Sequence, residues 1–397
     1  MTSASGSASA GRGDADPAAP PRLELDWEVA GRWGGRLASP GPTPSRGELE
    51  ALVADLHASA GLARPLALQA SRLGTALERV GATESRARVL VVDRAGWSRA
   101  AAQSFAGLTA PSQGHPGTGT DATDPADGLP VPDQPGASRG LGRAIAGARA
   151  VPVTAQAAGL LGLLAGRVLG QFDPFAPAAG PAGRLLLVAP NVLRTERALA
   201  ADRADFRLWV CVHEQTHALQ FAAAPWLVDH LRREIAALAE EVAGSSAGQD
   251  LAMAVARGLR ALRTGAEDPE DWSMLDLVLD EAQRDRVAQV TAVMSLLEGH
   301  ADVTMDAVGR RWIPTVRRLR ARMEARRRTA TGVDRWLRRL VGMDAKLAQY
   351  RRGAAFVRGV RRAAGRDALD AAWAGPEGLP TAREVVDPSA WVRRVHG

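Results

Sequence analysis

The segment 206–221, Phe-Arg-Leu-Trp-Val-Cys-Val-His-Glu-Gln-Thr-His-Ala-Leu-Gln-Phe, constrains the fold more than any other part of this chain. It is apolar around most of a helical turn, which predicts a largely buried α-helix. His213, Glu214 and His217 lie in the middle of that apolar pattern. Burying these side chains is costly unless they are paired, so the fold must supply them with a partner.

The spacing of these three residues suits a metal ion. Residues four apart on an α-helix lie one above the other on the same face, so His213 and His217 can bind one Zn²⁺ through two imidazole nitrogens. Glu214 lies about 100° around the helix, beside the open coordination position. There it could accept a proton from a water molecule and return it to a leaving amine. The alternative is a chance match, because the pattern His-Glu-x-x-His fixes only three positions.

A third protein ligand is expected further along the chain, because catalytic zinc takes three protein ligands and leaves its fourth position to water or substrate. Glu298 and Asp302 are four residues apart in an apolar helical pattern and share a face. We expect Glu298 to bind the metal and Asp302 to accept the other ring N–H of a ligand histidine. Two alternatives remain open: His300 as the ligand in place of Glu298, and a solvated face formed by the two acids.

With these residues the chain resembles the gluzincin branch of zinc metallopeptidases, whose third ligand is a glutamate on a following helix. One departure is the spacing from His217 to Glu298, which is 81 residues (298 − 217) and longer than in the best-known members. A helical hairpin from Pro225 to about Val278 is expected to fill this gap.

The wider sequence resembles the actinobacterial zinc-dependent metalloprotease-like proteins, some of which are labelled as associated with deazaflavin coenzyme biosynthesis. The resemblance is carried by stretches such as 166–175, 187–191 and 298–302. It implies a zincin-like fold, mainly α with a few short strands, and a zinc-dependent hydrolase, a metallopeptidase that cleaves an amide bond of a peptide or protein substrate. The alternatives are a zinc-binding protein without peptidase activity, such as another amide hydrolase or a pseudo-enzyme, and a helical interaction scaffold.

The charge composition says little about partners. The sequence pI is about 10.7. The chain nevertheless has 44 Asp and Glu residues against 50 Lys and Arg residues, which gives a net charge of +6. Every basic residue but Lys346 is arginine, which fits a GC-rich genome in which arginine replaces surface lysine and raises the pI. Clustered arginines in the segment 317–328 are the best argument for nucleic acid, but a solvated helix face is favoured. We therefore expect no nucleic-acid partner.

Three residues that this composition makes rare are candidates for the surroundings of the metal. Lys346 and Tyr350 are the only lysine and tyrosine, and they lie four apart on one expected helix. Tyr350 could stabilise an oxyanion and Lys346 could hold a substrate carboxylate, although a core position for Tyr350 is the alternative. Asn191, the only asparagine, ends an expected strand and either lines the substrate cleft or simply forms a turn.

The chain is expected to divide into a disordered leader (1–22), an N-terminal helical region (23–110), a flexible insertion or linker (111–138) and a zincin-like metal-binding domain (139–397). Residues 23–397 could instead pack as one unit. No apolar run approaches the roughly 20 residues that span a bilayer, so we expect no membrane association. The segment after Met1 does not read as a secretory signal, and Cys211 is the single cysteine, which together favour a cytoplasmic protein.

Apolar periodicity predicts short strands over 89–93 and 184–192. Capping and spacing predict helices over the following ranges: 45–61, 65–80, 96–108, 153–169, 205–223, 226–243, 249–264, 273–308, 313–328, 332–341 and 344–364.

Overall fold

A small sheet lies inside a mostly helical molecule. The computed structural model describes residues 25–109, 153–243, 280–328 and 343–397. Strand β3 (Arg184–Val188) is central, flanked by β1 (Arg88–Val92) and β2 (Gly170–Asp173). β1 pairs with β3 in parallel, with Leu90 opposite Leu186, whereas β2 pairs antiparallel, with Gln171 opposite Leu186. β2 is therefore an edge strand that begins at a glycine.

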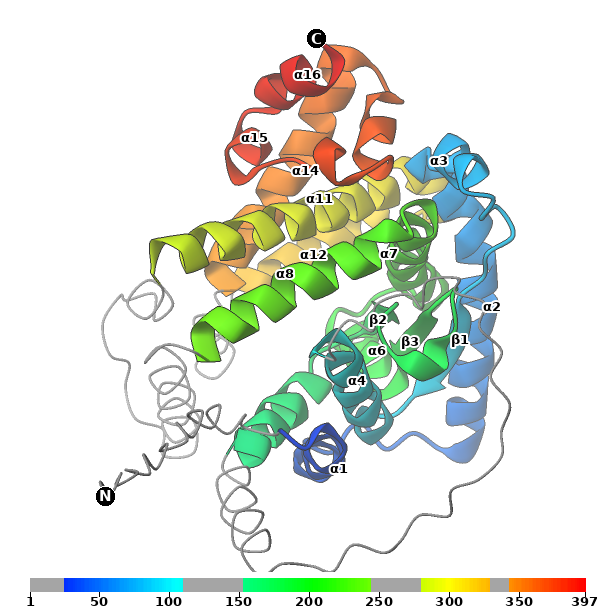
Figure 1. Ribbon diagram of the computed structural model, residues 1–397. Helices are drawn as coiled ribbons and strands as arrows, with labels where there is room; N and C mark the ends of the chain where they lie inside the picture. Colours follow the sequence, from blue (N-terminus) through cyan, green and yellow to red (C-terminus); the bar gives the residue numbers. More distant parts are fainter. Residues whose placement is uncertain (1–24, 110–152, 244–279, 329–342) are drawn as a thin grey trace, which may run out of the picture.

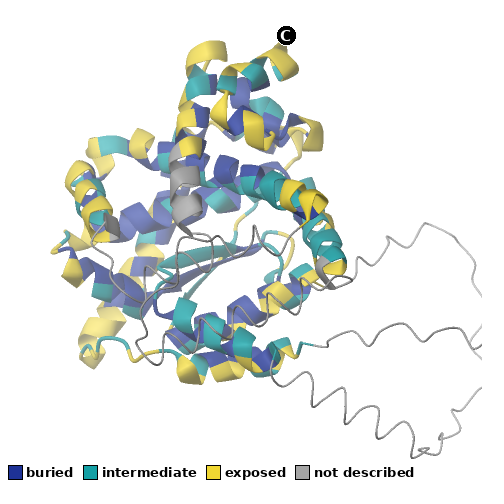
Figure 2. Cartoon of the chain, turned by 90° about the vertical axis from the view of Figure 1, so that its left-hand side faces the viewer, coloured by how far each residue is buried: buried dark blue, intermediate teal, exposed yellow. Residues whose placement is uncertain are grey.

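The central strand divides the interior into two apolar cores. All five residues of β3 are buried, and successive side chains of a strand point to opposite faces. Leu185 and Leu187 belong to the larger core, while Leu186 and Val188 belong to the smaller one. A continuous apolar strand is expected where both faces are covered, and Figure 2 shows buried residues on the sheet and on the helix surfaces turned towards it.

Helices cover the two faces of the sheet (Figure 1). On the side of the smaller core lie α1 (Trp27–Leu37), α4 (Arg94–Thr109) and a helix whose described part is 153–165. On the other side lie α2 (Arg46–Ser71), α3 (Gly74–Arg79), α6 (Ala189–Ala198) and α7 (Arg203–Ala223). α7, which carries His213 and His217, is thus held between the sheet and the remaining helices.

The remaining helices pack beyond α7. α11 (Glu281–Trp312) begins with a capping box formed by Asp280 and Gln283 and is kinked at Gly309. It lies against α7 and α8 (Trp226–Ala243), and α12 (Val316–Arg328) and α14 (Met343–Ala364) follow it. A 3₁₀ turn, Pro177–Ala179, connects β2 to β3, and the chain ends with the 3₁₀ turns Ala368–Trp373 and Pro376–Gly378, α15 (Ala382–Val386) and α16 (Pro388–His396).

The prediction of a mainly α fold with a few short strands is confirmed, but some boundaries were wrong. The helix expected over 45–61 and the first part of the helix expected over 65–80 form one helix, α2, which runs through Pro65 and ends at Ser71, and residues 74–79 form the separate helix α3. Packing of Leu56, Ala60 and Ala63 in the larger core overrides the loss of one backbone hydrogen bond. The strand expected over 184–192 ends at Val188, because Pro190 lies in the first turn of α6, where its missing N–H costs nothing.

Several predicted segments lie outside the described residues. They include the leader, the flexible insertion, most of the hairpin before α11, and the helices expected over 249–264 and 332–341. The proposed division into domains stays a prediction. Within the described ranges, no helix combines the length and the apolar character needed to cross a lipid bilayer.

Candidate metal centre

Three potential ligand atoms meet between α7 and α11. The Nε2 atoms of His213 and His217 are 3.1 Å apart. The carboxylate of Glu298 lies 3.3 Å from Nε2 of His213 and 3.7 Å from Nε2 of His217. These atoms form the one group of His, Cys, Asp and Glu ligands within the described ranges that could hold a metal ion.

The separations fit the donor set of tetrahedral zinc. Donors about 2.0–2.2 Å from a zinc ion at tetrahedral corners are roughly 3.3–3.6 Å from one another. Imidazole lone pairs and a carboxylate repel one another at such distances unless a cation lies between them. The three side chains are also only partly exposed, Glu298 by 21%, which leaves one side open for a further ligand.

A hydrogen-bond network fixes the ring of His217. Its Nδ1 lies 2.8 Å from Oε1 of Gln220, an acceptor, so Nδ1 carries the proton and Nε2 keeps its lone pair for a metal. The amide nitrogen of Gln220 donates to the carbonyl of Leu297, at 2.8 Å, and to Nδ1 of His300, at 3.1 Å. Gln220 thereby joins the histidine ligand on α7 to the turn of α11 that carries Glu298.

His300 ends this network and is not a metal ligand. Its side chain is buried, with 1% exposed, and its Nε2–H donates to the carbonyl of Ser71 at 2.9 Å. Burial lowers the pKa of His300 to about 3, with the charge of Arg361 adding to the shift. The alternative in which His300 replaces Glu298 is therefore wrong, because a helix turns by about 200° over two residues and places His300 on the opposite side.

Asp302 does not accept the N–H of a ligand histidine as predicted. Its Oδ1 accepts from Nη2 of Arg320 at 2.9 Å, and its backbone carbonyl accepts from the same nitrogen. Nδ1 of His213 instead faces the sulfur of Met305 at 3.2 Å. The orienting role expected of Asp302 belongs to Gln220, which the sequence interpretation missed. Its position three residues after His217 on the same helix was the available signal.

Glu214 lies against the beginning of β2. A Cβ atom added to Gly170 would meet Cγ, Cδ and Oε1 of Glu214 at 2.7–2.8 Å, so only glycine leaves room for the carboxylate there. Glu214 is 6% exposed, and the backbone N–H of Phe172 interacts with it. The glycine at the start of the edge strand thus allows a general-base candidate to sit beside the two histidines.

Burial and neighbouring charges shift the pKa values at this centre. Burial raises the pKa of Glu214, with Glu298 adding to the rise and the two histidines opposing it. Burial favours neutral His217, yet the charge and hydrogen bond of Glu298 outweigh it and raise the pKa of His217 to about 9. Partial burial favours the neutral form of Glu298, but His217 and His213 outweigh it and hold the pKa of Glu298 well below the usual range.

A cavity of about 610 Å³ opens onto these side chains. Its walls come from four elements: the start of β2 with the residues before it, α7, α11 and α12. Gly170 and Gln171 form one wall, and Trp97 fixes Gln171 by donating its indole N–H to Oε1 at 2.8 Å. His213, Glu214 and Glu298 all line the same cavity. A substrate in this space would lie between an edge strand and the metal centre.

Asn191 does not line this cavity, so its predicted substrate contact is wrong. It is completely buried at the start of α6. Its amide nitrogen donates to the carbonyls of Ala165 and Val168, both at 2.7 Å, and its oxygen accepts from Nε of Arg94 at 2.8 Å. Because β3 is the central strand of the sheet, the residues that follow it in the chain lie inside the protein and not at its surface. Asn191 instead holds the turn that leads into β2.

The remaining candidates are only partly placed. Lys346 and Tyr350 belong to the first turns of α14, but their side chains lie outside the described residues, so their predicted roles stay predictions. Cys211 is fully buried within the larger core, as expected of a packing residue.

Comparisons with known proteins agree with this geometry. The family model described as zincin-like metallopeptidase matches residues 25–392. A crystal structure from Chloroflexus aurantiacus, described as that of a candidate hydrolase with a novel fold, is 27% identical with a TM-score of 0.57. The similarity covers 94% of this chain and 98% of that one. A comparison with curated proteins finds no significant match. Because the family model spans nearly the whole sequence, the chain belongs to the zincin-like metallopeptidase family.

Proposed function

We propose that this protein is a zinc-dependent metallopeptidase in which His213, His217 and Glu298 hold the metal and Glu214 is the general base. The observation that carries the proposal is the convergence of two histidine Nε2 atoms and one carboxylate at 3.1–3.7 Å, beside a buried glutamate and an open cavity. Family membership, which implies a metal and typically zinc, supports it. The similarity to a candidate hydrolase adds support for hydrolysis as the reaction class.

The donor set suits zinc, which would act as a Lewis acid that polarises the substrate carbonyl and lowers the pKa of water. Glu214, whose pKa is raised mainly by burial, takes a proton from the attacking water. It then delivers this proton to the nitrogen that leaves when the amide C–N bond breaks. Gln220 keeps Nε2 of His217 unprotonated and aimed at the centre.

The substrate is an extended peptide bound along β2. Among the described strands, β2 pairs on one side with β3 and lies at the edge of the sheet. An edge strand offers backbone N–H and C=O groups with which an extended chain can pair. Gly170 and Gln171 belong both to this strand and to the cavity wall that faces Glu214, so a peptide paired there would pass the general base.

The test combines metal content with cleavage of a peptide library by zinc-loaded protein. The wild type should hold about one equivalent of zinc and cleave amide bonds. Glu214→Gln should keep the metal and lose cleavage by at least about 10²-fold, the low end of what a positioned general base contributes. The exposed Glu240→Gln on α8 is the matched control and should remain active.

Three other results would each overturn part of the proposal. Less than about half an equivalent of zinc after supplementation would remove the metal centre and favour a helical interaction scaffold. Stoichiometric zinc without cleavage of any library peptide would favour a zinc-binding protein or a hydrolase of another amide. Full activity in Glu214→Gln would remove Glu214 from the chemistry.

A further inference from the structure

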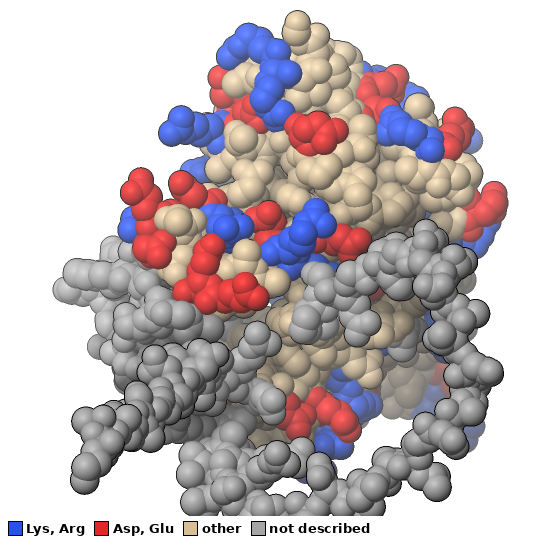
Figure 3. Space-filling model, in the orientation of Figure 1, with Lys and Arg blue, Asp and Glu red and all other residues tan. Residues whose placement is uncertain are grey.

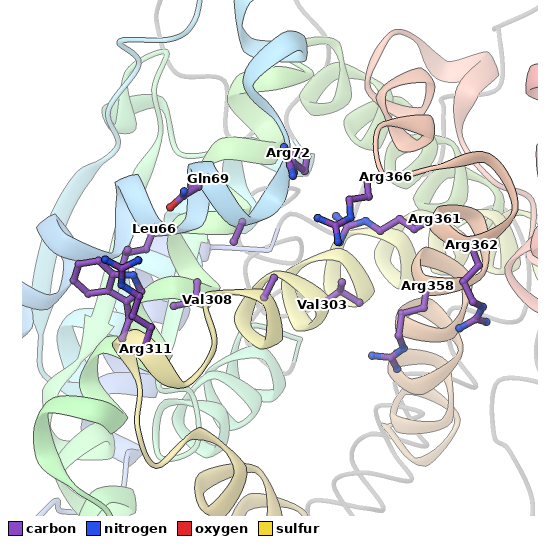
Figure 4. Close-up of a pocket in the computed structure, with 13 residues that line it drawn as sticks. Leu66, Gln69, Arg72, Val303, Val308, Arg311, Arg358, Arg361, Arg362 and Arg366 are labelled. Carbon is purple, nitrogen blue, oxygen red and sulfur yellow. The ribbon is translucent and has the colours of Figure 1, made fainter.

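A second cavity, of about 840 Å³, lies apart from the metal centre and shares no lining residue with the cavity there. It is formed where the end of α2, the last turns of α11 and the end of α14 meet. Six guanidinium groups line it: Arg72, Arg311, Arg358, Arg361, Arg362 and Arg366. Figure 4 shows Arg72 extending from α2 and the arginines of the α14 end lying across the cavity from it.

The walls of this arginine pocket carry no carboxylate among the described residues. An ion pair at the edge of the pocket joins Arg358 to Asp306 over 3.7 Å, a long contact between half-exposed groups that is worth little. The remaining lining residues are mostly apolar, such as Leu66, Val303 and Val308. The pocket thus combines concentrated positive charge with an apolar floor.

Several arginines elsewhere in the molecule are paired with carboxylates, unlike those that line this pocket. Arg184 pairs with Asp173 at 2.8 Å, Arg207 with Glu196 at 2.9 Å and Arg286 with Glu241 at 2.9 Å. On the face drawn in Figure 3, acidic and basic side chains lie close together. The composition, with 44 acids for 50 bases, would allow the same pairing in the arginine pocket. Its absence from the described walls points to a negative charge supplied from outside.

The backbone at Arg72 gives an independent indication. Arg72 follows α2 with φ of 67° and ψ of 29°, the left-handed conformation that most often carries glycine at a helix end. A non-glycine residue is strained there, although glycine is abundant in this chain, with 41 residues. A strained position that keeps a long cationic side chain suggests a use for that side chain.

Arg361 is held at the inner end of the pocket. Its Nη2 donates to the carbonyl of Ser71 at 3.4 Å, while its buried Nε has no hydrogen-bond partner in the part of the chain that the structure describes. Burial lowers the pKa of Arg361, and the charges of Arg72 and Arg366 lower it further, against the opposing charge of Asp367. An oxyanion between these groups would relieve their repulsion and satisfy the Nε–H.

We infer that the arginine pocket binds a small, multiply charged oxyanion, with Arg72, Arg361 and Arg366 as its principal contacts. Guanidinium groups bind carboxylate and phosphate oxygens in a bidentate manner, so both chemistries fit the walls. The concave space, closed by three helix ends, suits a compact ligand rather than a nucleic-acid strand. The apolar floor would contact an uncharged part of the same molecule.

Binding can be measured with pyrene-1,3,6,8-tetrasulfonate, a fluorescent polyanion, on the full zinc-loaded chain. Saturable binding at one site is expected, and added KCl should weaken it. Arg72→Gly and Arg366→Gln should each weaken it by at least about tenfold, as expected when one charge-assisted contact is lost. Arg352→Gln, an exposed arginine of α14 outside the pocket, should leave affinity unchanged.

Arg72→Gly keeps the test independent of folding, because glycine relieves the left-handed backbone and should not lower the melting temperature. Displacement of the dye by inorganic pyrophosphate or by benzene-1,3,5-tricarboxylate then separates a phosphate ligand from a carboxylate ligand. The inference is overturned if no saturable binding occurs, or if Arg72→Gly and Arg366→Gln bind as tightly as the wild type. It is also overturned if Arg352→Gln weakens binding equally, or if duplex DNA binds and each of the three arginine changes weakens it alike.

Discussion

Gln220 decides which nitrogen of His217 is available to a metal. Its Oε1 accepts the Nδ1–H of His217, and its amide donates both to Leu297 and to His300. Gln220→Leu removes the acceptor and leaves these donor and acceptor groups unpaired. We expect zinc affinity to fall by about 10–100-fold, the range typical for groups that orient a histidine ligand.

Competition with a chromophoric chelator measures this affinity directly. Gln215→Leu is a suitable control, because Gln215 is also buried on α7 but donates to the carbonyl of Ala60, away from the metal centre. Equal zinc affinity in wild type and Gln220→Leu would show that the network does not orient His217.

Gly170 acts through the position of Glu214. The Cβ of Gly170→Ala would lie 2.7–2.8 Å from three atoms of the Glu214 side chain, so the carboxylate must move. Because misplacing a catalytic group by about 1 Å can cost up to 10²-fold, we expect kcat to fall by at least about tenfold while zinc content stays at one equivalent. Steady-state kinetics with metal analysis checks this, and unchanged kcat would contradict the positioning role.

The candidate ligand residues could be picked out from the sequence because their chemistry is costly to bury without a partner. His213 and His217 stand four apart in an apolar helix, and Glu298 stands in a second apolar pattern, so each could be found from one element alone. Gln220 and Asn191 could not be assigned in the same way. Their roles depend on groups that are distant in sequence, namely His300 and Leu297 for Gln220, and Arg94 for Asn191.

At the scale of elements, the distance between α11 and α14 is set by two glycines. A Cβ at Gly299 would lie 2.1 Å from the backbone of Gly353, and one at Gly353 would lie 2.0 Å from the carbonyl oxygen of Ser295. Gly353→Ala must therefore separate the helices. Overpacking typically costs 1–3 kcal/mol, so we expect a loss of about 2 kcal/mol or more in the free energy of unfolding.

Chemical denaturation measures this loss of stability. Gly61→Ala is the control, and it is expected to change the stability in the opposite direction. Gly61 lies inside α2 with nothing within 4 Å of an added Cβ, so alanine there should stabilise by about 0.5–1 kcal/mol. If Gly353→Ala were as stable as the wild type, the close contact between α11 and α14 would be absent in solution.

Helix and strand boundaries could be predicted where a local sequence signal marks them, but not where tertiary packing determines them. The N-cap at Ser45 marks a helix start that the prediction and the structure share. The capping box at Asp280 and the proline at position 190 also mark helix starts, but the predicted helix over 273–308 and strand over 184–192 did not use them. The continuation of α2 through Pro65 depends on its contact with α7, which no local pattern reveals. β2 has four residues and becomes a strand only by pairing with β3, so it gave no periodic signal.

At the scale of the whole molecule, His300 makes the fold sensitive to acid. Its pKa is about 3 in the folded protein, mainly because of burial, against 6.5 for an ordinary histidine. Between these values the unfolded chain binds a proton that the folded chain excludes. The stability contributed by neutral His300 is therefore complete above pH 6.5 and falls by about 1.4 kcal/mol per unit as the pH drops towards 3.

Unfolding in EDTA at pH 7.5 and 5.5 tests this dependence without bound metal. His300→Gln should be less stable than the wild type at pH 7.5 but should lose about 1 kcal/mol less on acidification. The exposed His57→Gln should follow the wild type. Identical acid dependence in His300→Gln and the wild type would show that His300 is not held neutral by the fold.

Segments that are far apart in the sequence meet around one centre. A strand from the first hundred residues pairs with β3, α7 lies on that sheet, and α11 brings Glu298 to it from 81 residues further on (298 − 217). The fold therefore holds candidate ligand atoms from two helices at 3.1–3.7 Å from one another.

Anomalous diffraction at the zinc edge from crystals of zinc-loaded protein tests this claim most directly. One strong peak is expected within about 2.0–2.2 Å of Nε2 of His213, Nε2 of His217 and a carboxylate oxygen of Glu298. It should vanish in His217→Ala. A peak elsewhere, or none in protein shown to be folded and supplied with zinc, would contradict the metal centre.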